Sequence, residues 1–205
     1  MGVAERRVRE KEELRQRILD AATELFLQEG FENVSIRKIA DKIEYSPTTI
    51  YLHFKDKAEL MASICAHVFD GLAQALEEIE ALDLPPVEAL RRSLHRYIEF
   101  GLEHPNHYVV LFCLPQPEDL AKSLGEFKED TGMVCFEKLR VGVAKCINAN
   151  DIVATDIEIT SQSIFMMIHG VTSALISMKG FPWVDAKTLI ATSVDTILAG
   201  LAFKH

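Results

Sequence analysis

Three closely spaced helix-start signals constrain the N-terminal part of this chain most strongly. Ser35, Ser46 and Asp56 each stand just before a helix-forming segment, where a side-chain oxygen can accept a backbone N–H of the first turn. Pro47 follows Ser46 at the first helical position, where a missing N–H does no harm. The helix that starts after Ser46 must be short, because Asp56 already begins the next one.

The rest of the chain is predicted to be helical as well. Apolar side chains recur at helical spacing over residues 11–29, and Gly30 follows as a C-terminal cap. The next helices are expected after Ser35, after Ser46 and from Asp56 to about residue 81, followed by 87–103, 105–113, 118–148, 154–178 and 184–203. No alternating strand pattern persists, so the fold class is all-α with about nine helices. We expect two domains, residues 1–56 and 57–205.

The short third helix completes a helix-turn-helix. In this motif the N-terminal residues of a short recognition helix reach base edges in the major groove of DNA. Ile50 and Phe54 are four residues apart and are predicted to point inward and hold this helix on the core. Tyr51 and His53 are then left facing outward, where both can hydrogen-bond to phosphate.

Two segments together resemble the signature of the TetR/AcrR family of transcriptional regulators. They are residues 35–43 (SIRKIADKI) and 46–60 (SPTTIYLHFKDKAEL), and the resemblance extends from residue 18 to 60. It implies binding to double-stranded operator DNA, with an N-terminal helix-turn-helix domain and a larger helical domain for dimerisation and effector binding. The DNA-contacting residues implied by the resemblance are Ser35, Arg37, Ser46, Pro47, Thr48, Thr49, Tyr51, Leu52, His53 and Lys57. Those expected to hold phosphates are Thr49, Tyr51, His53 and Lys57.

The turn before the third helix departs from the family pattern. The family has Gly followed by a small aliphatic residue at the positions of Glu44 and Tyr45. A non-glycine residue in the left-handed conformation that this turn requires costs roughly 1 kcal/mol. An acidic side chain near phosphate also weakens non-specific DNA binding.

The net charge of −9 is unevenly distributed. Residues 1–60 carry 11 Lys/Arg against 12 Asp/Glu, and residues 61–205 carry 11 against 19. A local basic face can therefore dock on phosphate although the whole chain is acidic. We expect a cytoplasmic protein, because we find no secretory signal and no membrane-spanning helix, and the four cysteines form no CxxC pair.

The last two predicted helices carry few charged residues. Residues 157–178 hold Glu158 alone, and residues 185–203 hold Asp185, Lys187 and Asp195. Such helices are either wholly buried in one subunit or form an interface, and two of them per subunit would build a four-helix bundle in a homodimer. We expect the homodimer, since one short recognition helix reads too few bases alone.

The middle helices contain aromatic and soft side chains suited either to a core or to a small apolar or amphipathic effector. The candidate effector-binding residues are Tyr97, Phe100, Tyr108, Phe112, Phe165, Met166 and His169. The pair His169-Gly170 resembles the Trp-His-Gly motif of one family subdivision, with Ile168 in place of the Trp.

Other functions have weaker support. No phosphate loop, nucleophile elbow or catalytic carboxylate pair is present, so we expect neither an enzyme nor a cofactor. His104 and His107 are separated by Pro105 and lack a carboxylate cluster, so we expect no metal site. Two alternatives stay open: a DNA-binding regulator without an effector, and a helical carrier or enzyme that does not bind DNA.

Overall fold

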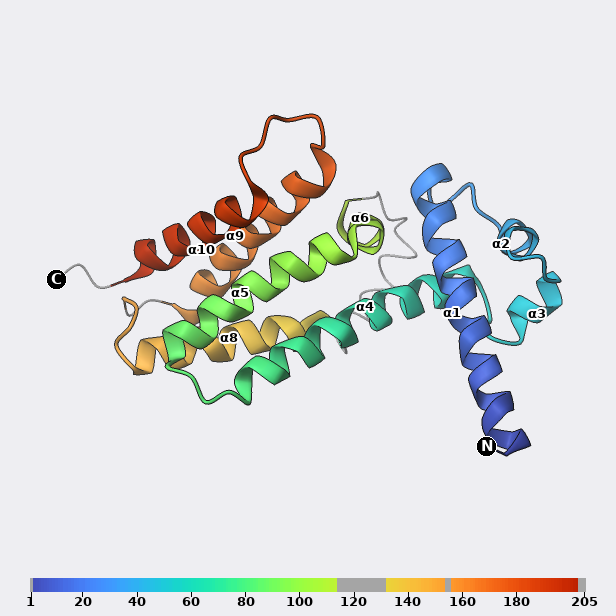
Figure 1. The fold of residues 1–205 in the computed structure, drawn as a ribbon, viewed down its shortest axis with the longest axis horizontal. Coiled ribbons are helices and arrows are strands. Elements are labelled where there is room, and N and C mark those ends of the chain that lie inside the picture. Colours follow the sequence, from blue (N-terminus) through green and yellow to red (C-terminus); the bar gives the residue numbers. More distant parts are fainter. Residues whose placement is uncertain (1, 114–131, 154–155, 203–205) are drawn as a thin grey trace. The chain divides into compact units, whose positions relative to one another are not determined.

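The computed structural model describes residues 2–113, 132–153 and 156–202, and within these ranges the fold is all-α (Figure 1). The described helices number nine, as expected, and one isolated antiparallel bridge joins Ile152 and Ala202. Their bounds are α1 (Val3–Glu29), α2 (Ile36–Lys42), α3 (Pro47–Tyr51), α4 (Lys57–Glu80), α5 (Pro86–Glu103), α6 (Pro105–Phe112), α8 (Gly132–Asn148), α9 (Ile157–Ser177) and α10 (Ala186–Leu201).

The first helix begins at Val3, so the expected start at residue 11 is wrong. Val8 in the additional turns is 71% exposed, and ion pairs one turn apart support these turns. Arg6 Nε lies 3.3 Å from Glu10 Oε1, and Arg9 Nε lies 3.5 Å from Glu13 Oε1. A search for apolar spacing alone therefore misses this part of the helix.

Two predicted helices begin later than expected, because an aspartate caps each of them. Asp156 accepts the backbone N–H of Ile159 at 2.9 Å, and Asp185 accepts that of Thr188 at 2.9 Å. Consequently α9 begins at Ile157 and α10 at Ala186, instead of residues 154 and 184. The predicted helix over 118–148 falls partly outside the described residues, which contain its portion from Gly132 onward.

The chain divides into two compact units, and the division falls within α4. Among the described residues, unit 1 comprises 2–67 and 106–113, and unit 2 comprises 68–105, 132–153 and 156–202. The predicted domain boundary after residue 56 stays a prediction, since compact units and folding domains need not end at the same residue. In unit 1, α1 packs on α2 and α2 packs on α3.

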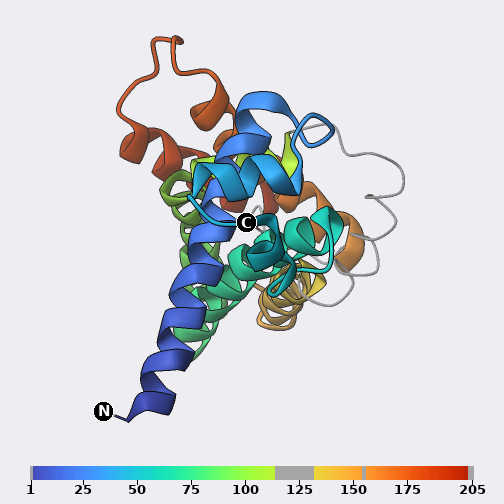
Figure 2. The same ribbon diagram turned by 90° about the vertical axis from the view of Figure 1, so that its right-hand side faces the viewer.

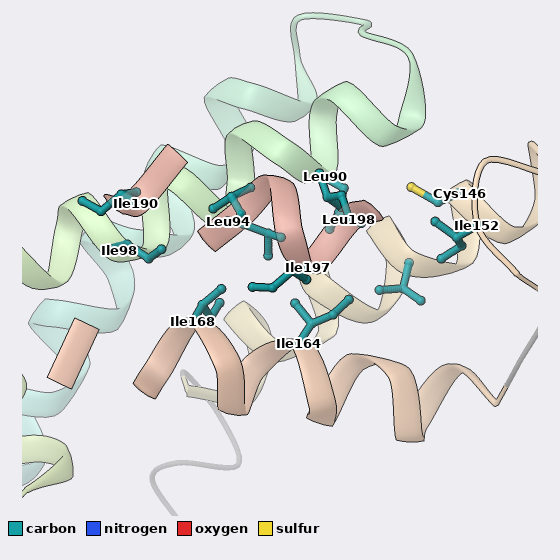
Figure 3. Close-up of a cluster of buried hydrophobic side chains, with 12 residues drawn as sticks. Leu90, Leu94, Ile98, Cys146, Ile152, Ile164, Ile168, Ile190, Ile197 and Leu198 are labelled. Carbon is teal, nitrogen blue, oxygen red and sulfur yellow. The ribbon is translucent and has the colours of Figure 1, made fainter. Parts of the chain in front are cut away.

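Unit 2 is a helical bundle in which α5 packs against α8, α9 and α10. Its main core gathers aliphatic side chains from all four helices (Figure 3). Leu94 and Ile98 of α5 lie among Ile164 and Ile168 of α9 and Val194 of α10, each at most 2% exposed. Each such side chain stabilises the fold by about 1.5–3 kcal/mol through burial.

The α9 helix has a second apolar side beyond the one it buries. It is the one helix in the described part of the chain whose length and composition would allow it to cross a membrane, and 33% of its most apolar window is buried. Ile159 is 65% exposed and Met166 is 72% exposed on this outer side. Because Ile164 and Ile168 anchor the opposite side in the core, this exposed side is available to a partner.

Candidate functional site

The third helix, α3, is capped at its N-terminal end and anchored in the core of unit 1 by two buried side chains. The Ser46 hydroxyl accepts the backbone N–H of Thr49 at 3.2 Å, as a helix N-cap does. Pro47 occupies the first helical position. Ile50 and Phe54 are 0% and 1% exposed, so the predicted inward face is confirmed. A five-residue helix is rigid here because these two side chains anchor it in the core of unit 1.

The outward side of α3 carries the side chains expected to reach DNA. Tyr51 is 56% exposed and Leu52 is 75% exposed, and Thr48 is exposed one turn earlier. Figure 2 views unit 1 from the side on which α2 and α3 lie. The phenol of Tyr51 can donate or accept a hydrogen bond, and the exposed Leu52 offers an apolar contact beside it.

His53 differs from the expectation that it faces outward. The side chain is half-buried, and its Nδ1 atom is buried without a hydrogen-bond partner among the described residues. Burial lowers the pKa of His53, and the charges of Lys11 and Arg15 lower it further, while Glu12 acts in the opposite direction. The imidazole is therefore mainly neutral near pH 7. The sequence did not reveal that Lys11 and Arg15 lie close enough to act on it.

Lys57 serves the structure of unit 1 directly. Its ammonium donates to the carbonyl of Phe31 at 2.6 Å and to that of Val34 at 3.0 Å, and it lies 4.1 Å from the Phe31 ring centroid. An ammonium has three N–H donors, so one remains for a phosphate. The expected phosphate contact of Lys57 stays a prediction.

The second helix offers fewer available cations than its sequence suggests. Ser35 caps it by accepting the backbone N–H of Lys38 at 3.2 Å. The Lys38 ammonium pairs with Glu29, and the Lys42 ammonium lies 2.9 Å from Glu24. Arg37 is exposed and forms no ion pair within the described ranges. Arg37 is thus the cation of α2 that can meet a base or phosphate.

The turn between α2 and α3 has the backbone conformation expected from the sequence. Glu44 adopts φ 62°, the left-handed region, and the Tyr45 N–H donates to the Ala40 carbonyl at 3.0 Å. The Arg17 guanidinium lies 5.4 Å from the Tyr45 ring centroid. The turn therefore forms with Glu44 in place of the glycine, at the expense of backbone strain.

Some of the candidate effector residues come together in unit 2. The Phe165 ring is stacked on His169 with centroids 5.7 Å apart, and it meets Tyr97 edge-on at 6.0 Å and Phe136 edge-on at 6.1 Å. We call these four residues the aromatic cluster. Burial lowers the pKa of His169, which favours a neutral imidazole.

Other candidate effector residues are not members of the aromatic cluster. Phe100 is buried with Leu72 and Leu76 of α4, and Tyr97 packs against this group as well. Met166 is on the exposed side of α9. Tyr108 and Phe112 contact each other at 4.9 Å and belong to unit 1.

No group of three or more His, Cys, Asp or Glu side chains within the described residues could hold a metal ion.

The family comparison agrees with this geometry. Residues 18–64 match the model of the bacterial regulatory proteins of the tetR family. This segment is a tetR-family N-terminal domain. The match covers the part of α1 that packs in the core, both helices of the helix-turn-helix and the start of α4.

A relative that extends over nearly the whole chain is the uncharacterised HTH-type transcriptional regulator YerO of Bacillus subtilis. It is 24% identical over 199 residues, which are 93% of this chain and 66% of YerO. The chain spans between about half and two thirds of the length of the curated relatives it matches. These relatives are named as HTH-type transcriptional regulators.

Solved structures share this fold over more than nine tenths of the chain. NalD of Pseudomonas aeruginosa, the secondary repressor of the MexAB-OprM multidrug efflux pump, has a TM-score of 0.81 at 20% identity and covers 95% of this chain and 100% of its own. The regulator FadR of Bacillus subtilis, solved with stearoyl-CoA, has a TM-score of 0.73 at 20% identity, with coverage of 91% and 98%. At these identities the similarity establishes the all-helical fold alone.

Proposed function

We propose that this protein is a homodimeric transcriptional repressor that binds operator DNA through α2 and α3 and is released by a small-molecule effector. The observation that carries the proposal is the division of α3 into two faces. Thr48, Tyr51 and Leu52 are exposed, while Ile50 and Phe54 fix the helix from below. A rigid helix with an exposed, partly apolar face suits base edges and thymine methyl groups.

The DNA-contacting residues of the proposal are those expected from the sequence. Arg37 would contact a base or phosphate, Pro47 and Thr48 would meet base edges, and Tyr51 would hold a phosphate. The remaining members of this set are Ser35, Ser46, Thr49, Leu52, His53 and Lys57. The exposure of Arg37, Thr48 and Tyr51 supports direct contacts, whereas Ser35 and Ser46 position the helices as N-caps.

The homodimer would form through α9 and α10. The exposed side of α9 presents Ile159 and Met166, and a side chain added at Gly170 of α9 or Gly200 of α10 would meet no atom within 4 Å in the single chain. Open glycines on helices with few charges allow a second pair of helices to approach closely. A dimer would supply two recognition helices, one for each of two successive major grooves about 34 Å apart.

The effector would contact the aromatic cluster. Its rings are partly buried, and the neutral imidazole of His169 offers one polar point among them. Such a lining suits a small apolar or amphipathic molecule. FadR of Bacillus subtilis was solved with stearoyl-CoA, an amphipathic ligand, and this chain shares its fold. We also assign the chain to the Trp-His-Gly subdivision, on the support of His169-Gly170.

Tyr97 gives the effector a route to α4. It contacts Phe165 of the aromatic cluster and also packs against the group formed by Phe100, Leu72 and Leu76. An effector that displaces Tyr97 would shift the packing of α4, the helix that starts immediately after the DNA-binding segment. Because coupling is reciprocal, operator DNA must weaken effector binding by the same factor.

The proposed regulator acts in the cytoplasm and without catalysis. We assign no catalytic role to any described residue, no cofactor and no membrane partner, and we place the protein in the cytoplasm. The relatives support this, since those matched here are transcriptional regulators.

Selection from random duplex DNA by the purified full chain tests the proposal. We expect an inverted repeat whose half-sites are centred about one helical turn or a multiple of it apart. Retention of no duplex even at low salt would contradict DNA binding and favour a small-molecule carrier. Adding stearoyl-CoA to the selected complex tests the effector step. Binding of this probe with unchanged operator affinity would favour a regulator that lacks effector release.

A further inference from the structure

A row of three cations runs along the N-terminal half of α1. Arg7, Lys11 and Arg15 are spaced four residues apart, so they share one face of the helix. Further along α1, Ile18 and Ala22 follow at helical spacing on nearly the same face, and both are 0% exposed in the core of unit 1. The row is therefore the continuation of the core-facing stripe of α1 beyond the core, with cations in place of apolar residues.

The inner end of this row lies beside the end of α3. The Arg15 guanidinium is 4.5 Å from the ring centroid of Phe54, and the charges of Lys11 and Arg15 both act on His53. Both Figure 1 and Figure 2 show the first turns of α1 extending beyond α2 and α3. Arg7 and Lys11 are exposed on this extension.

No described acidic side chain forms an ion pair with a cation of this row, whereas the cations on the opposite face of α1 are paired. Arg6 and Arg9 pair with Glu10 and Glu13 one turn along. Arg7, Lys11 and Arg15, in contrast, form no ion pair with any residue that the structure describes. Glu12 is the acidic residue of this segment that acts on His53, and the two cations outweigh it. Unpaired cations thus lie on one face and ion pairs on the other.

We propose that Arg7, Lys11 and Arg15 form a second DNA-binding element, which grips the phosphate backbone outside the bases that α3 reads. This inference rests on the proposed function. Arg7 and Arg15 are two helical turns apart, about 12 Å along the axis. A DNA strand advances about 3.4 Å along the duplex axis per phosphate, so a row lying parallel to that axis would span roughly three or four phosphates. Phosphate contacts of this kind add affinity and position without reading sequence.

Two matched double variants of the full-length protein test this element. Arg7→Gln with Lys11→Gln removes two cations from the row. Arg6→Gln with Arg9→Gln removes two cations from the opposite face, so the net charge changes equally in both. Losing an exposed pair one turn apart changes helix stability by only about 0.3–0.5 kcal/mol. Circular dichroism and thermal unfolding would verify that both variants are folded.

The measurement is the dependence of DNA affinity on salt concentration, on a selected operator with long flanks. The affinity falls linearly on a plot of log K against log salt, and each lost phosphate contact makes this line less steep by about 0.9. In a dimer we expect the slope for the Arg7/Lys11 variant to be less steep than the wild-type slope by about 2–4. The Arg6/Arg9 variant should have the wild-type slope. Shortening the flanks should remove the difference between the Arg7/Lys11 variant and the wild type.

Equal slopes for both double variants would overturn the inference. If the wild type then still bound its operator and Tyr51→Ala abolished that binding, the proposed function would stand and the second element alone would fall. If the wild type bound no selected or random DNA at low salt, both would fall.

Discussion

The ammonium of Lys57 donates a 2.6 Å hydrogen bond to the backbone carbonyl of Phe31 and lies over the ring of the same residue. A second bond reaches the carbonyl of Val34 at 3.0 Å. One cation at the start of α4 thus satisfies two carbonyls of the loop between α1 and α2. This arrangement fixes the loop that leads into the helix-turn-helix.

Replacing Lys57 by Met should destabilise the fold while keeping the apolar part of the side chain. Charge-assisted hydrogen bonds contribute about 1.5–3 kcal/mol, and the site is partly exposed, so we expect a loss of about 1–2 kcal/mol in the free energy of unfolding. Urea denaturation measures this. Lys55→Met, at a neighbouring exposed lysine, is the control. If both variants matched the wild type in stability, the two carbonyl contacts would have no energetic role.

Glu44→Gly should stabilise the protein. The left-handed conformation at φ 62° strains a glutamate but not a glycine, and the relief is about 1 kcal/mol, reduced somewhat by the greater freedom of glycine in the unfolded chain. Glu44→Gln distinguishes the effect of backbone strain from the effect of charge, because it keeps the strain and removes the carboxylate. We expect Gly alone to raise the free energy of unfolding, and both variants to raise DNA affinity at low salt. Equal stability of the Gly and Gln variants would argue against strain at this turn.

Stability should fall as the pH drops below about 6.5, the ordinary pKa of histidine. Burial lowers the pKa of His53 and of His169, so folding favours their neutral forms. Their contribution is complete above the unfolded pKa and is lost as the pH falls through the folded values. Urea unfolding at pH 7.5 and 5.5 tests this. The double variant His53→Gln/His169→Gln should lose less stability than the wild type between these two pH values.

A charge on the outer side of α9 should separate the proposed homodimer. Met166 is 72% exposed in the single chain, so Met166→Glu leaves the monomer core intact. Burial of an unpaired charge at the interface should raise the dimer dissociation constant about 30-fold or more, the effect of losing a typical hot-spot residue. Sedimentation velocity over a range of concentrations measures this. Leu82→Glu, at a 54% exposed residue after α4, is the control, and equal dimer content in both would contradict the interface.

The features that the sequence predicted well depend on local interactions. Ser35 and Ser46 cap helices through bonds that reach only three residues along the chain. Ile50 and Phe54 were expected inside because their spacing sets one helical face, and the structure confirms this. Glu44 was expected in the left-handed region because the family that the segment resembles has glycine at this position, and its φ of 62° confirms that.

The features that were missed depend on tertiary packing or on charge. His53 was expected to face outward, and the structure instead half-buries it next to Phe54, whose ring lies under Arg15 of α1; spacing within α3 does not determine this contact. The double contact of Lys57 requires Phe31 and Val34 to approach from a loop over twenty residues away. The start of α1 at Val3 was missed because ion pairs, not apolar residues, support those turns.

Binding of operator DNA by the wild type, compared with Tyr51→Ala and Tyr51→Phe, tests the central claim most directly. Fluorescence anisotropy on DNA from the upstream region of its own gene, or on a selected operator, gives the affinities over a range of salt concentrations. We predict tight, salt-sensitive binding by the wild type, a loss of about tenfold or more for Tyr51→Ala, and an intermediate affinity for Tyr51→Phe. Tyr51 is 56% exposed, so these changes leave the fold intact. Equal DNA affinity of all three proteins, or no binding by the wild type at low salt, would contradict the account.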